Sequence, residues 1–574
     1  MQRLWSVAAL AAALLAGGCG NLDVENPNAP DAKRAFLDPS GLTQLLGGAV
    51  RTWVDTRGNY FGPLDMVAMA DSYTASWNNA AIRFYTSVGV ECPSRCGWTN
   101  SATAPEAAGG PSVEGQWYGY YTVLSSATDV LRAISNGLCF DTNCAVDDTR
   151  TTRNKTIAKM LQGMALTGIA LNYDQGFIVD ETTDLSNVAA LPFSTRQEIR
   201  DAAIKKFDEA VTEAGVKSWS TPPEFHGVGG GRTYTNTQLR QLIRTMQAEL
   251  LAMFPRNSAE NGQVAWAQVA TYASEGVSSG AAFDWEFYID AGSARGGLDY
   301  VKYWGNSIGT MRVDTRVAAL ITSNHQDPWP QPDGNPCPTV SADKRVGDGS
   351  WGPEDDFNGY ATLAATANAG TDYACSGVAI FPAARGQYHQ SNLQHIRYNY
   401  LAEPGENLPE FDATGQDPLY TRQMNDLLWA EGLIRSGGNK LLAAQKINNS
   451  RVGRGGLPAL TGAESDAELL SALQYEQEIE FMGQGATPFY NRRRIDGLLA
   501  GTPRQMPVPA KELDVLVREI YTFGGPSAPD MSINVGTGGA VGTVVPGGKA
   551  SVRSVREIWN QYQAQARELA SRKH

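Results

Sequence analysis

The chain has 574 residues, of which 42% are hydrophobic and 19% are charged, so it is globular and long enough for about one to three domains. Its formal net charge of −13 argues against a nucleic-acid partner, because such a partner requires a basic surface. Beyond the N-terminal segment, no stretch has the length and apolarity of a membrane-spanning helix.

The first 18 residues have the pattern of a secretory signal peptide. Arg3 precedes an apolar run from Leu4 to Ala16, which is too short to span a bilayer, and two glycines follow. Cys19 comes directly after these small residues, as in the lipobox of bacterial lipoproteins. We therefore predict that residues 1–18 are removed, that Cys19 carries a diacylglycerol and that residues 19–40 form a membrane tether. The alternative is a plain secretory peptide, with Cys19 lost or free.

The remaining cysteines are even in number, which in an exported protein predicts disulfides. The simplest pairing follows their order in the chain: Cys92 with Cys96, Cys139 with Cys144, and Cys337 with Cys375. The alternative joins the first four cysteines in a zinc site. Their spacings are loose for zinc and the compartment is oxidising, so we expect no metal there.

Apolar residues recur with helical spacing in several segments, and these segments come in pairs. The pairs are 157–168 with 199–211, 239–250 with 266–277, and 427–434 with 441–447. Antiparallel helix pairs with alanines at their contacts are typical of tetratricopeptide-like units. We therefore predict a mostly α-helical protein, an α-α superhelix of such pairs, with Trp117, Trp266 and Trp429 in its core.

Two segments depart from this helical pattern. Residues 280–418 are rich in Gly, Pro, Asp and aromatic residues and lack a helical period, which predicts a long loop-rich excursion. Residues 521–574 contain a Gly-rich stretch at 524–548 and then a predicted amphipathic helix near 551–571. The helical domain is therefore expected over residues 41–520.

Five segments carry motifs whose order along the chain is specific. They are NLDVENPN at 21–28, QWYGYYTVLSSATDVLRAI with its Trp-x₃-Tyr pattern at 116–134, LLWAEGLIRSGGNKLLAAQKINNSRVGRGGLP at 427–458, ELLSALQYEQEIEFMGQGATPFYNRRRIDGL at 468–498 and MPVPAKEL at 506–513. In these motifs the chain resembles the SusD/RagB family of outer-membrane nutrient-binding lipoproteins. The likeness runs from Cys19 to about residue 520.

The resemblance implies a SusD-like fold, a partner and a function. Members of this family cover a SusC-like TonB-dependent β-barrel transporter in the outer membrane, capture a nutrient, usually a glycan, and pass it to the barrel. We therefore expect a lipid-anchored outer-membrane protein, exposed at the cell surface, that binds an oligosaccharide or similar nutrient for uptake.

Sugars present apolar CH faces and polar hydroxyl edges, so their sites combine aromatic planes with Asp, Asn, Gln or Arg side chains. The loops of this chain offer several such residues, and Tyr303 lies among them. The candidates for ligand binding are Trp77, Arg83, Tyr85, Trp98, Trp285, Tyr300, Trp304 and Trp329. For each of them, ordinary packing is the alternative.

An enzyme is the less favoured interpretation. Asp284 with Glu286, or the acidic residues of EQEIE at 476–480, could supply the carboxylates of a glycosidase. Alternate positions on a helix face different ways, so we interpret EQEIE as solvated charges with one ion pair to the arginines at 492–494.

The five histidines, at 226, 325, 389, 395 and 574, form no metal motif. We therefore expect no catalytic residue and no cofactor, although calcium remains possible in the Asp-rich loops. A lipid-anchored enzyme that trims glycans and a helical-repeat scaffold for protein partners are the alternatives.

Overall fold

The computed structural model describes residues 38–59, 61–75, 81–88, 92, 95–101, 112–186, 191–290, 298–306, 310–323, 327, 341–346, 370–375, 389–391, 393–401 and 413–525. The predicted signal peptide, Cys19 and the helix expected near 551–571 lie outside these residues. Trp77, Trp329 and Cys337 do so as well. Among the described helices, none is long and apolar enough to cross a membrane.

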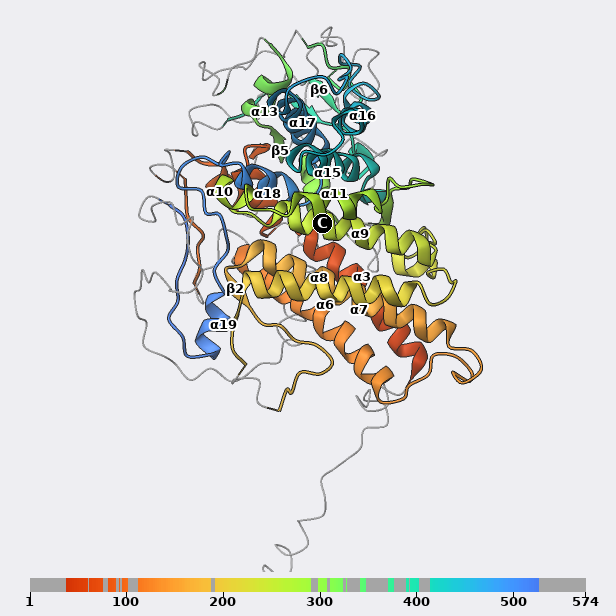
Figure 1. The fold of residues 1–574 in the computed structure, drawn as a ribbon. Coiled ribbons are helices and arrows are strands. Elements are labelled where there is room, and N and C mark those ends of the chain that lie inside the picture. The colour runs from red at the N-terminus through yellow and green to blue at the C-terminus, as the bar shows by residue number, and fades with distance from the viewer. Residues whose placement is uncertain are drawn as a thin grey trace, which may run out of the picture.

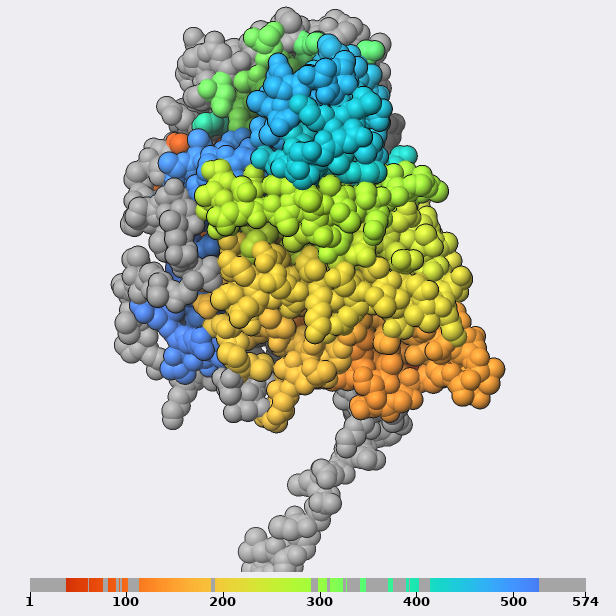
Figure 2. Space-filling view, viewed as in Figure 1, coloured from red at the N-terminus to blue at the C-terminus, as the bar shows by residue number. Residues whose placement is uncertain are grey.

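Long helices build the body of the described chain. They are α3 (Pro39–Arg57), α6 (Ser112–Ser135), α7 (Thr149–Asn172), α8 (Arg196–Ala214), α9 (Asn236–Met253), α11 (Trp266–Ser274), α15 (Arg422–Arg435), α16 (Lys440–Arg451), α17 (Asp466–Glu480) and α18 (Thr487–Arg494). From α6 to α16, each of these helices packs against the next in chain order. Figure 2 shows the resulting stack as successive bands of colour.

Shorter elements connect and cover this stack. The short helices are α4 (Pro63–Met69), α5 (Ile82–Thr86), α10 (Ser258–Asn261), α12 (Tyr300–Gly305), α13 (Thr315–Ile321), α19 (Ala510–Val515) and the 3₁₀ turns η2 (Pro223–His226) and η4 (Asn399–Leu401). The strands are β1 (Tyr73–Ala75), β2 (Gln175–Gly176), β3 (Ser194–Thr195), β4 (Trp285–Asp290), β5 (Met311–Val313), β6 (Tyr373–Cys375), β7 (Leu393–His395) and β8 (Thr414–Tyr420). They form the antiparallel pairs β1–β5, β2–β3, β4–β8 and β6–β7.

The predicted helix pairs are confirmed. α7 packs against α8, α9 against α11, and α15 against α16. Capping boxes set the starts of several helices: at α8, for example, Thr195 accepts a hydrogen bond from the N–H of Glu198, whose side chain accepts one from Thr195 in return. The helical periodicity of the sequence therefore gives both the helices and their partners, as expected for a mostly α-helical fold.

Glycines allow close approach at two of the contacts between helices. A Cβ atom at Gly432 of α15 would lie 2.6 Å from the backbone nitrogen of Ala270 in α11. A Cβ atom at Gly163 of α7 would lie 2.6 Å from the ring of Phe207 in α8. Any larger side chain at these positions would push the helices apart.

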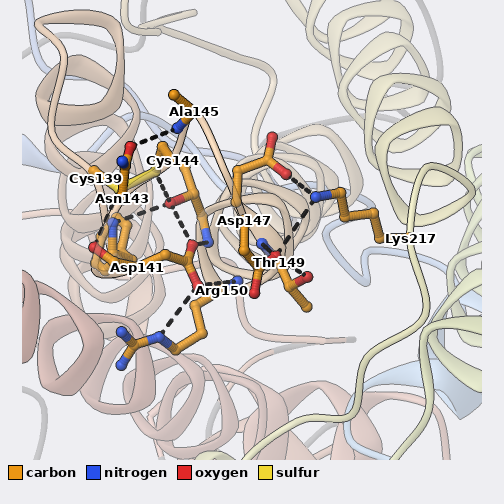
Figure 3. The surroundings of a disulfide bond; sticks show 12 residues. Cys139, Asp141, Asn143, Cys144, Ala145, Asp147, Thr149, Arg150 and Lys217 are labelled. Carbon is orange, nitrogen blue, oxygen red and sulfur yellow. Dashed lines mark hydrogen bonds and ion pairs between the residues drawn. A yellow bond between two sulfur atoms is a disulfide. The ribbon is translucent and has the colours of Figure 1, made fainter.

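The loop between α6 and α7 is closed by the disulfide Cys139–Cys144, which Figure 3 shows. Asp141 lies inside this loop, and its carboxylate accepts hydrogen bonds from the backbone N–H groups of Arg150 and Thr151 at 3.1 and 3.0 Å. These N–H groups belong to the first turn of α7 and have no partner within the helix. The disulfide loop therefore supplies the N-terminal cap of α7.

The loop-rich segment predicted at 280–418 leaves and rejoins the helices at one place. β4 lies near its start and β8 at its end, and the two strands pair with Trp285 opposite Tyr420 and Ile289 opposite Gly415. Alternate residues of β4 are buried, which is the pattern of a strand with one face on the core. Where it is described, the segment between them consists of short helices and strands.

The described residues bury two large apolar cores and one small cluster of Ala374 and Ile396. The larger core lies within the helical stack and includes Trp117 and Trp266, while Trp429 packs against it, as the sequence predicts. The second core gathers residues of α4, β1, α12, β5 and α13, among them Tyr73, Val313 and Trp304. This second core supports the surface formed by β1 and β5.

The prediction that the acidic residues of EQEIE are solvated is wrong. Glu476, Glu478 and Glu480 are all buried in α17. Glu476 and Glu480 lie one turn apart and both pair with Arg345, at 2.7 and 3.3 Å. Glu478 pairs with Arg316 at 2.8 Å. The one pair expected with the 492–494 arginines is present, since Glu478 also lies 3.6 Å from Arg492.

Glu431 of α15 forms a buried ion pair of the same kind. Both of its carboxylate oxygens accept hydrogen bonds from Arg494 at 2.7 Å, and its side chain is 1% exposed. Burial raises the pKa of Glu431, but Arg494, Arg435 and Gln477 together outweigh burial and lower this pKa from 4.5 to about 2. Because the folded-state pKa lies below the ordinary value, the ionised carboxylate stabilises the fold above about pH 4.5. This contribution is lost as the pH falls toward 2.

We expect Glu431→Gln to lower the free energy of unfolding at pH 7 by about 3–5 kcal/mol, because it leaves Arg494 buried without a charged partner. Urea unfolding at pH 7, 4.5 and 3 measures this difference. The difference should stay constant down to about pH 4.5 and then shrink. Glu275→Gln is the control: it removes a pair whose Glu275 side chain is 55% exposed, and it should cost less than about 1 kcal/mol. Equal losses in both variants would contradict the prediction.

Candidate functional site

The β1–β5 pairing joins two distant parts of the sequence. Tyr73 of β1 lies opposite Val313 of β5, so the segment that carries Arg83 and Trp98 meets the segment that follows Tyr300 and Trp304. α12 contacts both α4 and β5, and α5 contacts both α4 and β1. The described segments that carry Arg83, Tyr300 and Trp304 therefore pack around the second core beside β1 and β5.

A group of mostly buried charged residues lies beneath the surface formed by β1 and β5, and we call it the β1–β5 cluster. Its members are Asp71, Arg95, Asp314, Arg316, Asp327 and His389.

Arg95 and Asp71 form a buried ion pair between the guanidinium and Oδ1. Asp71 has a φ of 52°, a left-handed conformation that Asp tolerates better than most residues, and it turns the chain from α4 into β1. Arg95 also donates to the carbonyls of Tyr85 and Thr86, at 2.9 and 2.8 Å, at the end of α5. The neighbouring disulfide Cys92–Cys96 closes the loop that carries Arg95. Arg95 therefore fixes α5 against the start of β1.

Arg316, at the start of α13, links this pair to the helical stack. Its Nε donates to the carbonyl of Asp71 at 2.9 Å, and its Nη2 donates to Glu478 of α17 at 2.8 Å. Burial lowers the pKa of Arg316, but the carboxylates of Glu478, Asp71 and Asp314 outweigh burial and raise this pKa above its ordinary value. Arg316 is therefore a permanent cation at the centre of the site.

Asp314 is fully buried and caps α13, since its Oδ1 accepts a hydrogen bond from the N–H of Arg316 at 2.8 Å. Burial and the nearby Asp71 raise the pKa of Asp314 to about 7. His389 Nδ1 lies 3.5 Å from Asp327 Oδ1, to which Thr315 also donates at 2.9 Å. Burial lowers the pKa of His389, but Asp327 and Asp314 outweigh it and raise this pKa above the ordinary value.

Two groups of residues in the described chain have the donors and the spacing to hold a metal ion. One is Asp314, Asp327 and His389. The other is Cys139, Asp141 and Cys144, but its two sulfurs are joined in a disulfide. The zinc alternative for the first four cysteines fails for the same reason, since Cys92 is bonded to Cys96.

The structure places four of the predicted ligand residues in the two cores: Tyr85, Trp98 and Trp285 in the larger one and Trp304 in the second. The side chains of Trp285 and Tyr85 are fully buried, and that of Trp98 is nearly so. Trp285 packs between Trp53 and Tyr420, while Trp98 packs against Tyr85 with ring centroids 5.0 Å apart. Their rings have no exposed face for a ligand, because β4 and the loop at 95–101 turn them inward.

The remaining described candidates lie nearer the surface. Arg83 and Tyr300 are half-buried, as is Tyr303 beside them in the sequence pattern. Trp304 is mostly buried, and its ring meets Tyr300 edge-on at 5.3 Å. Arg83 and Tyr300 are therefore the predicted ligand residues with accessible side chains in the described chain.

The carboxylates considered for hydrolysis are held by arginines. Asp284 accepts hydrogen bonds from the backbone N–H and the guanidinium of Arg422, at 2.8 and 3.2 Å. Glu286 pairs with Arg232 at 2.6 Å. Each carboxylate thus has an arginine partner.

In the described part of the chain, hollows lie elsewhere on the molecule as well. One, of about 750 Å³, lies between α13, α16 and α17 and is lined by Leu320 and Tyr475. Another, of about 870 Å³, lies between α3 and the disulfide loop at 139–144 and is lined by Arg51 and Phe140. Neither of these is lined by a predicted ligand residue.

The fold is similar to solved structures of one superfamily. A SusD homologue from Bacteroides thetaiotaomicron matches with a TM-score of 0.53 at 14% identity, covering 85% of this chain and 97% of its own. A SusD superfamily protein from Parabacteroides distasonis matches with a TM-score of 0.53 at 10% identity, covering 82% and 97%. This protein has a SusD-like fold. The fold that the sequence motifs imply is thus confirmed.

A third similar structure is a SusD-like carbohydrate-binding protein from Bacteroides vulgatus, with a TM-score of 0.50 at 14% identity, covering 80% of this chain and 83% of its own. No protein-family model and no curated protein matches the sequence. The similarity to SusD-like proteins therefore shows in the fold, although the sequence identities are low.

Sequence reasoning missed most of the β1–β5 cluster in this SusD-like protein. Arg316 lies in the short helix α13 and Asp314 directly before it, while Arg95, Asp327 and His389 lie in loops without a motif. The one available signal was the Asp-Thr-Arg step at 314–316, which is typical of a helix N-cap. It predicts the start of α13 but not the partners that meet there.

We expect Asp71→Asn to destabilise the region around β1 and α5 by about 3–5 kcal/mol, because it leaves Arg95 buried without its counter-charge. Asn accepts the left-handed conformation of Asp71, so the loss of charge is the main change. Amide hydrogen exchange of residues 71–86 and thermal unfolding measure the effect. Asp208→Asn is the control, since Asp208 is paired at an exposed position. If both variants exchange alike, the Asp71–Arg95 pair does not hold this region.

Proposed function

We propose that this protein captures a glycan or a similar nutrient outside the cell and delivers it to a SusC-like TonB-dependent transporter. The SusD-like fold supports this proposal, and one similar structure is named as a carbohydrate-binding protein. The signal peptide and the lipobox at Cys19 support export and anchoring in the outer membrane. The transporter partner follows from the motif resemblance to the SusD/RagB family.

The composition of the β1–β5 surface is the observation that carries the proposal. Tyr300 and Tyr303 are half-buried and lie on α12, and Arg83 lies on α5. Both helices contact α4. In addition, α12 contacts β5 and α5 contacts β1, the two strands next to the charged β1–β5 cluster. Aromatic rings cover the apolar faces of a sugar, while charged and polar side chains bind its hydroxyl groups. This surface offers both kinds of group over a rigid support.

We infer binding without catalysis. The carboxylates that could hydrolyse a glycoside are engaged by arginines: Asp284 by Arg422, Glu286 by Arg232, and Glu476 by Arg345. A retaining or inverting glycosidase needs two carboxyl groups that face one sugar from opposite sides. In the described chain these three carboxylates serve the fold instead.

Calorimetry of the protein from Asn21 onward against a panel of soluble polysaccharides and oligosaccharides tests the proposal, with chromatography of each mixture afterwards. Binding with intact ligand is the expected result. Shorter products would show a trimming enzyme, and no binding to any glycan would favour a scaffold or another nutrient. Co-purification of a β-barrel transporter with the anchored protein tests the partner.

We expect Tyr300→Ala and Arg83→Ala each to weaken glycan binding about tenfold or more, which corresponds to about 1.4 kcal/mol. Tyr300→Phe keeps the ring that would stack on the sugar, so it should retain most of the affinity. Arg240→Ala is the control for Arg83, since Arg240 is an exposed arginine on α9 within the helical stack. Unchanged affinity in Tyr300→Ala and Arg83→Ala would place the ligand elsewhere on the protein.

A further inference from the structure

We propose that Asp314, Asp327 and His389 form a binding site for a divalent transition-metal ion such as Zn²⁺. One donor atom from each of the three residues lies within 4.8 Å of the other two. The residues come from three separate places in the chain: the start of α13, the position 327 and the position 389. Folding therefore brings together two carboxylates and an imidazole that are distant in sequence.

A buried oxygen of Asp314 provides independent support. Oδ1 of Asp314 is used in capping α13, but Oδ2 is buried and accepts no hydrogen bond from any described residue. The guanidinium of Arg316 does not donate to this oxygen, because it is directed to the carbonyl of Asp71 and to the carboxylate of Glu478. A buried carboxylate oxygen without a partner is costly. A cation bound between Asp314, Asp327 and His389 would satisfy it.

The spacing of the donors fits a small ion. Two ligands that each lie about 2.1 Å from a tetrahedral zinc are about 3.4 Å apart. The observed distance between His389 Nδ1 and Asp327 Oδ1 is 3.5 Å.

Neighbouring hydrogen bonds hold these donors in place. Thr315 donates its backbone N–H to the carbonyl of His389 at 3.0 Å and its hydroxyl to Asp327 Oδ1 at 2.9 Å. Ser391 donates its hydroxyl to the carbonyl of Val313 in β5 at 2.7 Å. Such outer contacts orient the ligands in known metal sites.

The donor set selects the class of metal. Calcium takes six to eight oxygen ligands, whereas imidazole with carboxylates suits zinc and other first-row transition metals. With three protein ligands, the ion would keep at least one position for water or an oxygen of a bound molecule. The Asp327 side chain is 34% exposed, so the ion can enter from solvent.

Zinc binding to the mature chain, purified without an affinity tag and dialysed against a chelator, tests this proposal. Equilibrium dialysis with metal analysis should find one tightly bound Zn²⁺ per chain, and zinc should raise the temperature of unfolding. Asp314→Asn should weaken zinc binding about 100-fold or more, and it should still fold, because Asn caps helices as well as Asp does. His389→Gln should weaken zinc binding to a similar extent.

Asp466→Asn is the matched control, since Asp466 is an exposed carboxylate paired with Lys440, and it should bind zinc like the unaltered chain. Absence of bound zinc in the unaltered chain would overturn the proposal. Zinc binding that survives in both Asp314→Asn and His389→Gln would also overturn it, as the ion would then sit elsewhere. Preferential calcium binding that is unchanged in His389→Gln would exclude an imidazole ligand and overturn it as well.

Discussion

Three consecutive arginines in α18 fix the positions of the other helices. Arg493 is fully buried and donates to the carbonyls of Leu171 and Met253, at the ends of α7 and α9. Arg494 holds Glu431 of α15 through two hydrogen bonds, and Arg492 lies 3.6 Å from Glu478 of α17. A buried cation without its partner is strongly destabilising. Each arginine is therefore compatible with only one position of the helix end or carboxylate that it contacts. Through these contacts, α18 joins helices that are far apart in sequence.

A second ionic network attaches the loop-rich segment to this frame. Glu480 of α17 binds Arg345 and Arg397 from that segment at 3.3 and 2.7 Å, and it also binds Arg454. The three arginines outweigh the effect of burial and lower the pKa of Glu480 below its ordinary range. Buried charge thus acts together with the apolar contacts of the second core to place this segment on the helical scaffold. This arrangement suits binding proteins, whose ligand-contacting loops need a rigid support.

The sequence predicts the helical part of this fold well because apolar spacing depends only on local residues. It identified α7 with α8 and α15 with α16, and it placed Trp117 in the core. It could not predict that Glu476 and Glu480 are buried, since their partner Arg345 is more than a hundred residues away and has no periodic signal. The burial of Trp98 and Trp285 could not be predicted for a related reason: an aromatic residue in a segment without helical periodicity looks the same in sequence whether it faces solvent or core.

One chain of polar contacts runs from the helical frame to the proposed ligand surface. It passes from Arg492 to Glu478, then to Arg316, to the carbonyl of Asp71 and finally to Arg95. Because its members are buried and mutually bonded, the frame sets the geometry of the β1–β5 surface before any ligand arrives. A preorganised surface loses little entropy on binding. If the proposed function holds, the choice of ligand rests with accessible side chains such as Arg83 and Tyr300, which are not members of this ionic chain.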